Sequence, residues 1–227
     1  MNVAIVAATP YSEDAFWSTS PLGQSLERLG RRDDRSTSVA FANRIGLPEV
    51  YNMHLSLVST ADAVVFLHDD VWLDDFFLTT RVLEGLQHYD VIGVAGNRRR
   101  LPRQPSWAFT DTEFKWDEPE NLSGAVAMGD YPFGQLSFFG QCPADCELLD
   151  GVLLAVKPAA LIQTSVRFDP TFPFHFYDLD FCRQARQAGL RLGTWPIAIT
   201  HQSGGSFGSP AWHASYHQYL SKWNEEP

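Results

Sequence analysis

The chain has 227 residues, of which 44% are hydrophobic and 19% are charged. This size and composition are typical of a folded domain with a sizeable core and exclude a disordered or fibrous chain. The 17 basic and 27 acidic residues give a formal charge of −10, which argues against a general nucleic-acid binder because such proteins carry a basic face. No apolar run approaches the roughly 20 residues of a membrane span, and the first residues lack the features of a secretory signal. We therefore expect a cytoplasmic protein without a transmembrane segment.

Strands and helices alternate over the first 96 residues. Short apolar or β-branched runs predict strands at 3–7, 38–42, 63–67 and 91–95. Apolar residues at helical spacing predict helices at 22–29, 48–59 and 74–88. Such alternation predicts an α/β fold whose sheet has helices on both faces.

The alternation stops at residue 97. Residues 97–149 contain five of the 14 prolines and many aromatic side chains, so we expect a long, irregular, aromatic-rich insertion. Loops of this length in a compact domain are usually functional. Regular structure is expected to resume with a strand at 152–156, a helix at 178–188, a strand at 191–199 and a terminal helix from 210.

The clearest predicted strand, 63–67, ends in His68-Asp69-Asp70. Open α/β sheets bind ligands outside the carboxyl ends of their strands, and carboxylate oxygens at such a point suit Mg²⁺ or Mn²⁺ that bridges to phosphates. The alternative is a solvated turn whose aspartate caps the next helix.

His201 follows the strand predicted at 191–199, so it too is expected at a strand's carboxyl end. Residues 203–206 are glycine and serine, whose backbone N–H groups can face an anion. A lone histidine is more often structural than a ligand. Because His201 and the acidic pair Asp69-Asp70 are both expected at the carboxyl ends of strands, a site that they share is favoured.

Asp178 occupies the expected N-cap of the helix at 178–188. There the helix dipole would hold its carboxylate in the anionic form, which suits a general base for a substrate hydroxyl. The alternative is a cap without a catalytic role. Asp180 is the second carboxylate of this stretch.

Three further signals are weaker. The basic cluster at 98–103 could contact a diphosphate or a phosphorylated acceptor, but arginines in loops are mostly solvated. His213 and His217 have the i, i+4 spacing of a metal pair, although a third ligand is missing. The three cysteines lack a second pair of soft ligands for zinc, so we expect reduced, structural thiols.

Four segments, in order along the chain, resemble the family 2-like glycosyltransferases, which have the A-type nucleotide-diphospho-sugar transferase (GT-A) fold. The family's D-x-D-like motif is similar to AVVFLHDDVWLDD in this chain, and the helix before that motif is similar to LPEVYNMHLSLVSTAD. LLDGVLLAVKPAALI followed by FDPTFPFHFYDLDFCRQARQAGLRLG resembles the acceptor strand and the catalytic helix. Two later segments also resemble the family, namely THQSGGSFG and YLSKW. The resemblance spans almost the whole chain, is weakest at 10–35 and 97–140, and implies a mixed, mostly parallel sheet.

For the metal site, the resemblance implies a role for each residue of the His68-Asp69-Asp70 run. Asp70 matches the last aspartate of the motif, which binds Mn²⁺ or Mg²⁺, and His201 matches a histidine that joins the metal in several relatives. Asp69 takes the middle position. His68 stands where a first aspartate is often found and so departs from the family's pattern.

For the reaction, Asp178 resembles the aspartate of the family's Glu-Asp pair, the base that activates the acceptor, with Tyr177 in place of the glutamate. The resemblance also implies contacts to the nucleotide, the donor sugar and the acceptor. The residues at those positions are Thr9, Asn43, Asp150 and Gly151.

The resemblance implies one domain over 1–227, with a nucleotide- and metal-binding half at 1–96, the insertion at 97–149 and an acceptor-binding, catalytic half at 150–227. It implies an inverting, metal-dependent glycosyltransferase that moves a sugar from a nucleotide-diphosphate donor to a hydroxyl of a glycan or lipid-linked acceptor. Surface-polysaccharide assembly at the inner face of a membrane is the family-level setting.

Two alternatives remain open from the sequence. A sugar nucleotidyltransferase on the same kind of sheet would need a glycine-rich, basic loop after the first strand, where this chain reads AATPY. A non-catalytic nucleotide- or glycan-binding module is the alternative outside enzymes.

Overall fold

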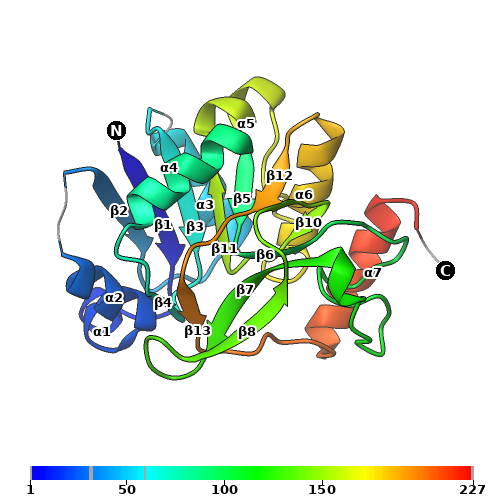
Figure 1. The fold of residues 1–227 in the computed structure, drawn as a ribbon, viewed down its shortest axis with the longest axis horizontal. Helices are drawn as coiled ribbons and strands as arrows, with labels where there is room; N and C mark the ends of the chain where they lie inside the picture. The colour runs from blue at the N-terminus through cyan, green and yellow to red at the C-terminus, as the bar shows by residue number, and fades with distance from the viewer. Residues whose placement is uncertain (1, 31–32, 59, 226–227) are drawn as a thin grey trace.

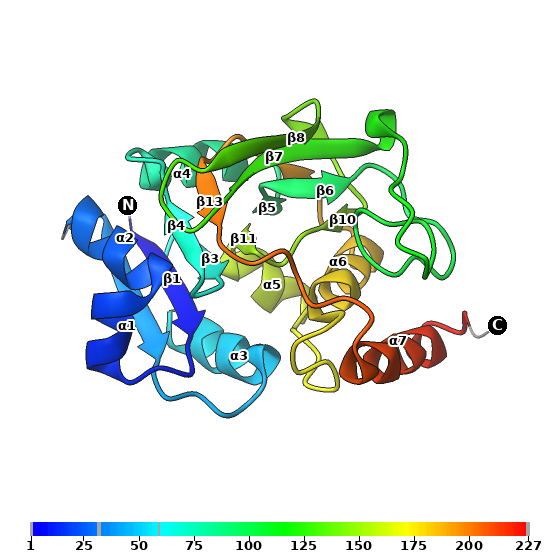
Figure 2. The same cartoon turned by 90° about the horizontal axis from the view of Figure 1, so that it is seen from below.

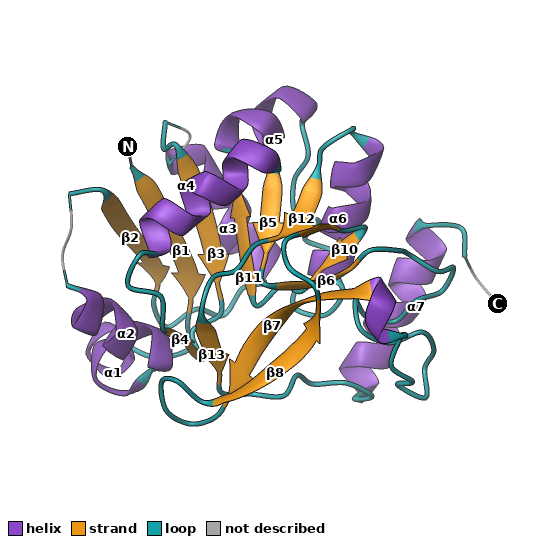
Figure 3. Ribbon diagram, viewed as in Figure 1, coloured by secondary structure: helices purple, strands orange, loops and turns teal. Residues whose placement is uncertain are grey.

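The computed structural model of the chain describes residues 2–30, 33–58 and 60–225, which form two mixed β-sheets with α-helices packed around them (Figure 1, Figure 3). None of the described helices is both long enough and apolar enough to cross a lipid bilayer.

The larger sheet has seven strands in the order β2-β1-β3-β11-β5-β12-β9. Their bounds are β1 Val3–Ala8, β2 Arg35–Ala40, β3 Ala63–Leu67, β5 Val91–Gly93, β9 Ala144–Asp145, β11 Leu153–Val156 and β12 Leu192–Thr194. β1 is parallel to β2 and β3, and β5 is parallel to β12, whereas β11 is antiparallel to both β3 and β5, and β9 is antiparallel to β12. Five of the seven strands therefore point the same way, which confirms the mixed, mostly parallel sheet.

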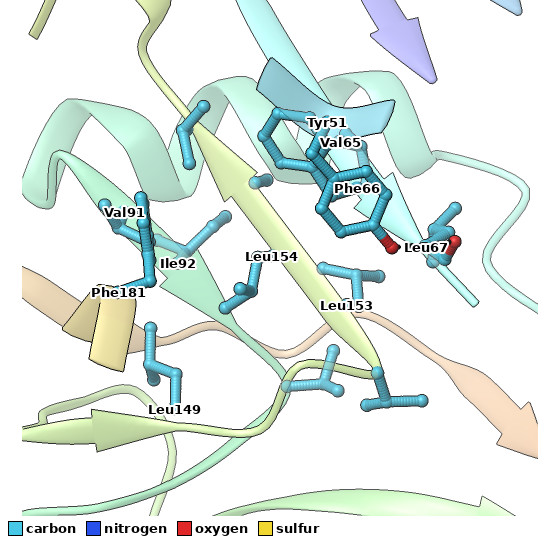
Figure 4. Close-up of a cluster of buried hydrophobic side chains, with 14 of the residues drawn as sticks. Tyr51, Val65, Phe66, Leu67, Val91, Ile92, Leu149, Leu153, Leu154 and Phe181 are labelled. Carbon is cyan, nitrogen blue, oxygen red and sulfur yellow. Dashed lines mark hydrogen bonds between the residues drawn. The ribbon is translucent and has the colours of Figure 1, made fainter. Parts of the chain in front are cut away.

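The centre of this sheet is fully buried. Every residue of β1 and β3 is buried, as expected for apolar, β-branched strands covered on both faces. Figure 4 shows Tyr51 packed against Phe66 of β3, with ring centroids 4.6 Å apart, and Leu153 and Leu154 on the neighbouring strand. The residues that directly follow β1 and β3 are therefore attached to the fully buried centre of the larger sheet.

Seven α-helices surround the sheets in the described residues. Their bounds are α1 Glu13–Thr19, α2 Pro21–Leu29, α3 Leu47–Leu57, α4 Leu78–His88, α5 Pro158–Thr164, α6 Tyr177–Gln187 and α7 Pro210–Lys222. Figure 2 shows α4 on one side of the large sheet and α3 and α6 on the other. α3 and α6 agree with the predicted helices, although Ser59, the last residue predicted for α3, lies outside the described residues.

Two short helices were not predicted, and one predicted helix begins later than expected. α1 and α5 have only seven residues each, too few to show a clear apolar periodicity. The helix predicted from residue 74 begins at Leu78, because Asp75 first forms a turn in which its Oδ1 accepts a hydrogen bond from the Phe77 N–H.

The insertion is less irregular than the sequence suggested. The smaller sheet has strands in the order β10-β6-β7-β13-β4, with β8 paired to β7. Their bounds are β4 Val71–Leu73, β6 Ala95–Asn97, β7 Leu122–Met128, β8 Gln135–Gly140, β10 Leu148–Leu149 and β13 Ile199–His201. Residues 97–149 thus supply β7, β8, β9 and β10, and only the stretch before the short 3₁₀ helix at Pro119–Asn121 is a long loop. The expectation of an irregular insertion is correct for that stretch alone.

The strand predicted at 191–199 is also wrong as a single element. It is divided into β12, which belongs to the larger sheet, and β13, which belongs to the smaller one. Pro196 lies between them and cannot donate a hydrogen bond to a ladder. Because of this division, His201 lies on a strand of the smaller sheet, although the segment before it belongs to the larger sheet.

Candidate active site

The pairing of β4 with β13 brings two distant segments of the chain together. His68-Asp69-Asp70 forms the turn between β3 and β4, and β13 pairs with β4 so that His201 lies opposite Val71. The Gln202 N–H also donates to the Asp70 carbonyl at 3.0 Å. His201 is thereby held beside the acidic turn, as the sequence predicted from their positions at strand ends.

His68, Asp70 and His201 form a triad whose ligand atoms all lie within 4.8 Å of one another. The Asp70 Oδ1 atom is buried and has no hydrogen-bond partner among the described residues. The His201 Nε2 atom lies 3.3 Å from it, at the distance of an ion pair but without the geometry of a hydrogen bond. A buried carboxylate oxygen that no protein donor satisfies, with two imidazoles around it, fits a divalent cation.

The three side chains of the triad change one another's pKa values. Burial would raise the pKa of Asp70, but His201 and His68 lower it well below its usual range. Burial would lower the pKa of His201, but Asp70 raises it. Burial lowers the pKa of His68, so His68 is neutral and keeps one nitrogen lone pair for a ligand.

Tyr177 fixes the orientation of His68. The Tyr177 hydroxyl donates to the Gly151 carbonyl at 2.9 Å and lies 2.9 Å from the His68 Nε2 atom. Because the hydroxyl proton is used for Gly151, the imidazole donates through Nε2 and its Nδ1 atom carries the free lone pair. Tyr177, at the position where the resemblance implied a glutamate, therefore orients a histidine of the triad.

Asp178 is not the N-cap of α6. The cap is Phe176, in the left-handed region with φ of 65°, and Asp178 is the second helical residue. Its Oδ2 accepts from the Gly151 N–H at 3.0 Å and its Oδ1 from the Leu179 N–H at 2.9 Å. Burial, together with the nearby Asp150 carboxylate, raises the pKa of Asp178 to about 7.

A pKa of about 7 means that Asp178 is only partly ionised at neutral pH, whereas the sequence predicted a carboxylate that the helix dipole keeps anionic. The free-energy cost of desolvating the charge, together with the repulsion of Asp150, exceeds the effect of the dipole and of two backbone hydrogen bonds. A carboxyl group with a pKa near neutrality is nevertheless well matched to general-base work.

The turn at Asp150 and Gly151 lies against Tyr177 and Asp178, since Gly151 is hydrogen-bonded to both side chains. The Asp150 Oδ2 accepts from the indole Nε1–H of Trp107 at 2.7 Å, and its Oδ1 accepts from the Val152 N–H. A Cβ atom on Gly151 would lie 2.3 Å from the Tyr177 hydroxyl oxygen. Only glycine allows this close approach of the β10–β11 turn to α6.

Two cavities meet at the histidines of the triad. The first, of about 540 Å³, lies at the strand ends and is lined by residues that include Thr9, Asn43, Arg44, Asp69 and Asp70. The second, of about 300 Å³, is lined by residues that include Asp150, Gly151, Tyr177 and Asp178. His68 and His201 line both, so the triad lies at the junction of the two spaces.

The strand-end cavity contains Thr9, Asn43 and Asp69, three of the residues that the resemblance implied for the donor, whereas Asp150 and Gly151 line the second cavity. The Thr9 hydroxyl donates to the Asp69 Oδ2 at 2.6 Å, which links the ends of β1 and β3. The Asn43 side-chain N–H donates to the Ile45 carbonyl and so shapes the loop after β2. Arg44, which the sequence reasoning missed, is the one Lys or Arg among the described residues that line either cavity. Its position directly after Asn43 was the signal available.

The remaining candidates lie elsewhere. Asp180 is fully buried and accepts hydrogen bonds from Lys222, Trp223 and Gln184, an arrangement that joins α6 to α7. His213 and His217 line a separate cavity near Arg103. In the basic cluster, Arg99 pairs with Asp117 and Arg100 with Glu225.

The three cysteines are free, and burial raises the pKa of each thiol, that of Cys146 to about 12. These thiols are therefore protonated at neutral pH.

The fold is that of the GT-A type of glycosyltransferase. The structure of GalNAc-T7 with UDP, GalNAc and Mn²⁺ is similar at a TM-score of 0.61 and 10% identity, over 99% of this chain and 49% of that chain. The structure of S. aureus TarS 1-349 gives 0.53 and 12%, over 98% and 65%. That of A197 from STIV gives 0.51 and 13%, over 86% and 82%. No family model and no curated protein matches the sequence.

This chain thus spans about half the length of the GalNAc-T7 chain. At identities of 10–13%, the likeness establishes the fold, and the resemblance to family 2 in particular remains a prediction.

Proposed function

We propose that the protein is an inverting, metal-dependent glycosyltransferase that moves a sugar from a nucleotide-diphosphate donor to a hydroxyl group of a glycan or lipid-linked acceptor. One observation carries the proposal. His68 and His201 line both cavities, so a triad that could hold a metal ion lies between a strand-end cavity and a cavity that contains a carboxyl group with a pKa of about 7.

The strand-end cavity is the donor side in this proposal. A nucleotide lies against Thr9 and Asn43, and Arg44 supplies a positive charge for its diphosphate. A divalent ion at the triad would neutralise the negative charge that develops on the leaving diphosphate. The mixture of two imidazoles and one carboxylate suits Mn²⁺ better than Mg²⁺, which prefers oxygen ligands.

The second cavity is the acceptor side. Asp178 accepts the proton of the acceptor hydroxyl as this oxygen attacks the anomeric carbon on the face opposite the leaving diphosphate. A single displacement of this kind inverts the configuration and needs one base and no enzyme nucleophile. The hydrogen bonds from the Gly151 and Leu179 N–H groups hold both oxygens of the base in place.

A screen of nucleotide-sugars tests this function directly. We expect at least one of a panel of UDP-, GDP-, CMP- and dTDP-linked sugars to raise the melting temperature in the presence of Mn²⁺, since a ligand of the native state stabilises it by mass action. The same donor should be hydrolysed slowly when Mn²⁺ is present. Binding without turnover, with or without added acceptors, would favour the non-catalytic module, and turnover of a nucleoside triphosphate with a sugar phosphate would favour the nucleotidyltransferase.

The proposal predicts a pH dependence. A base with a pKa of about 7 is mostly protonated at lower pH, so the rate of transfer should rise about tenfold per pH unit below that value and level off above it. The measurement is the transfer rate at saturating donor, acceptor and Mn²⁺ between pH 5.5 and 9. A rate that is flat across this range would contradict the role of Asp178.

His201→Ala tests the triad. We expect Mn²⁺ affinity to fall by about tenfold or more, since an imidazole ligand and the partner of Asp70 are lost together, while nucleotide affinity without metal stays unchanged. Calorimetric titrations with Mn²⁺ and with nucleotide measure both. His213→Ala, at an exposed position in the separate cavity, is the matched control and should change neither. Unchanged Mn²⁺ affinity in His201→Ala would exclude His201 as a ligand.

A further inference from the structure

The cavity around Asp178 has an aromatic wall that the proposed chemistry does not explain. Trp107 and Trp116 come from the long loop of the insertion and Phe139 from β8, and the Trp116 and Phe139 rings are stacked at 5.8 Å with an interplanar angle of 18°. Trp107 contacts both edge-on, at 6.3 and 4.9 Å. Across the opening, Phe174 stacks on His68 at 6.0 Å.

This wall is partly open to solvent. Trp116 is 51% exposed, although a tryptophan indole is among the largest apolar groups a chain can bury. Trp107 is fixed in contrast, because it is 8% exposed and its indole N–H donates to Asp150. A fixed tryptophan therefore supports an exposed one whose ring is free for a ligand.

The charges of the two cavities differ. The described residues that line the aromatic cavity include no Lys or Arg. Its acidic groups are Asp150 and Asp178, and Asp178 is only partly ionised near neutral pH because its pKa is raised to about 7. His68 and His201 line it where it meets the strand-end cavity. The strand-end cavity contains Arg44 and the metal triad. The strand-end cavity is also lined by Asp69 and Asp70, so it would attract an anionic group when a divalent cation occupies the triad, whereas the aromatic wall offers no comparable charge.

We propose that the aromatic cavity binds the acceptor as an uncharged sugar ring, with one apolar face of the ring on Trp116 and a hydroxyl directed at Asp178. This inference rests on the proposed function and specifies its substrate class. A ring that carries a carboxylate or a phosphate is disfavoured beside Asp150 and the aromatic wall, because no Lys or Arg lines the cavity there and the triad lies at its far end, where it meets the strand-end cavity. In a lipid-linked acceptor, any phosphate must lie outside the cavity.

The size of the cavity and the state of its carboxylates agree with a neutral ring. Its volume of about 300 Å³ is at the lower end of small-molecule sites, roughly 300–1,000 Å³, so it holds a ring unit rather than a long chain. Both oxygens of Asp150 and of Asp178 already accept hydrogen bonds from N–H groups. Each retains lone pairs that accept from hydroxyl groups.

The competing ligand class is a cation, because carboxylates and aromatic faces can also hold an ammonium group. The surroundings of Asp178 oppose it. The cavity shifts this carboxyl group toward its neutral form, with a pKa of about 7, which lowers the attraction available to a cation at the reacting end of the site.

The test measures sugar binding without catalysis. Methyl glycosides of glucose, galactose, mannose and N-acetylglucosamine are titrated into the protein by ligand-observed NMR and tryptophan fluorescence, with and without Mn²⁺ and UDP. The comparison set is methyl glucuronide, glucose 6-phosphate and methyl glucosaminide, which carry a carboxylate, a phosphate and an ammonium group. We expect at least one neutral ring to bind about tenfold or more tightly than all three charged ones.

Trp116→Ala should weaken the binding of that neutral ring by about tenfold or more. The matched control is Phe138→Ala. Phe138 is 70% exposed, neighbours Phe139 on β8 and faces the opposite side of the strand, where it lines another cavity. Its loss should leave sugar binding unchanged, and thermal unfolding of both variants checks that each is folded.

Several results would overturn the inference: no binding of any neutral ring, equal or tighter binding of a charged ring, or wild-type affinity in Trp116→Ala. These results can be distinguished from a failure of the proposed glycosyltransferase function. Sugar binding without turnover of any donor would refute the transferase and keep the neutral-sugar site. Donor turnover that uses phosphorylated and neutral acceptors equally would keep the transferase and refute the site.

Discussion

Replacing Asp178 by asparagine is expected to lower the rate of sugar transfer by about 10²- to 10⁴-fold, the usual contribution of a general base. The variant keeps the size of the side chain but can neither carry a negative charge nor accept the proton of the acceptor hydroxyl. Donor and Mn²⁺ affinities should stay near those of the wild type, because Asp178 does not line the strand-end cavity that contains Asp70. Transfer rates and calorimetric affinities at pH 8 measure the two effects separately.

The structure also predicts the stability of Asp178→Asn. The asparagine has one accepting oxygen where the carboxylate uses two, so it loses the hydrogen bond from either Gly151 or Leu179, at a cost of about 0.5–1.5 kcal/mol. This loss is offset by removal of a desolvated charge that Asp150 repels. We therefore expect a melting temperature close to that of the wild type.

Asp180→Asn is the matched control, since it makes the same change two residues further along α6. Asp180 accepts from Lys222 and Trp223 of the C-terminal segment, so this variant should unfold more readily without a specific loss in the chemical step. If Asp178→Asn transferred sugar at a near-normal rate and Asp180→Asn did not, the base would be Asp180. If Asp178→Asn failed to fold, its role would be structural.

Much of the candidate metal site could be predicted because it depends on local sequence. A buried β-branched strand followed by carboxylates places Asp69 and Asp70 at a sheet edge without knowledge of the rest of the fold. The partner of Asp70 was less certain, since His201 reaches it only through the pairing of β13 with β4. That pairing depends on a change of sheet at Pro196, and the sequence alone favoured one continuous strand there.

The chemistry of Asp178 could not be read from its position. The spacing of apolar residues located α6 to within one residue, but the pKa of Asp178 depends on burial and on Asp150, which lies 28 positions earlier in the chain. The aromatic wall likewise depends on contacts between residues that are distant in the sequence. Trp107 and Trp116 lie in a loop without periodicity, and they become a surface only when β7 and β8 bring Phe139 against them.

Asp70→Ala is expected to abolish measurable transfer and to remove the part of nucleotide binding that depends on Mn²⁺. The carboxylate is the one anionic member of the triad, and its loss leaves two imidazoles to bind a dication. A metal ion that stabilises a leaving diphosphate supplies several kcal/mol to the transition state, so a decrease of about 10³-fold or more should follow. Nucleotide affinity measured without metal should change little.

The fold of Asp70→Ala should persist, which is what separates a metal ligand from a structural residue. The Asp70 Oδ1 satisfies no hydrogen-bond donor of the described chain, and the side chain is 28% exposed, so its removal costs little beyond the interaction with His201. Thermal unfolding without metal should occur at a slightly lower temperature than in the wild type, because the favourable interaction of Asp70 with His201 is lost, while the stabilisation that Mn²⁺ and nucleotide give together should disappear. If the variant kept its activity, or responded to Mn²⁺ as the wild type does, the metal would lie elsewhere and the division into donor and acceptor cavities at the triad would be wrong.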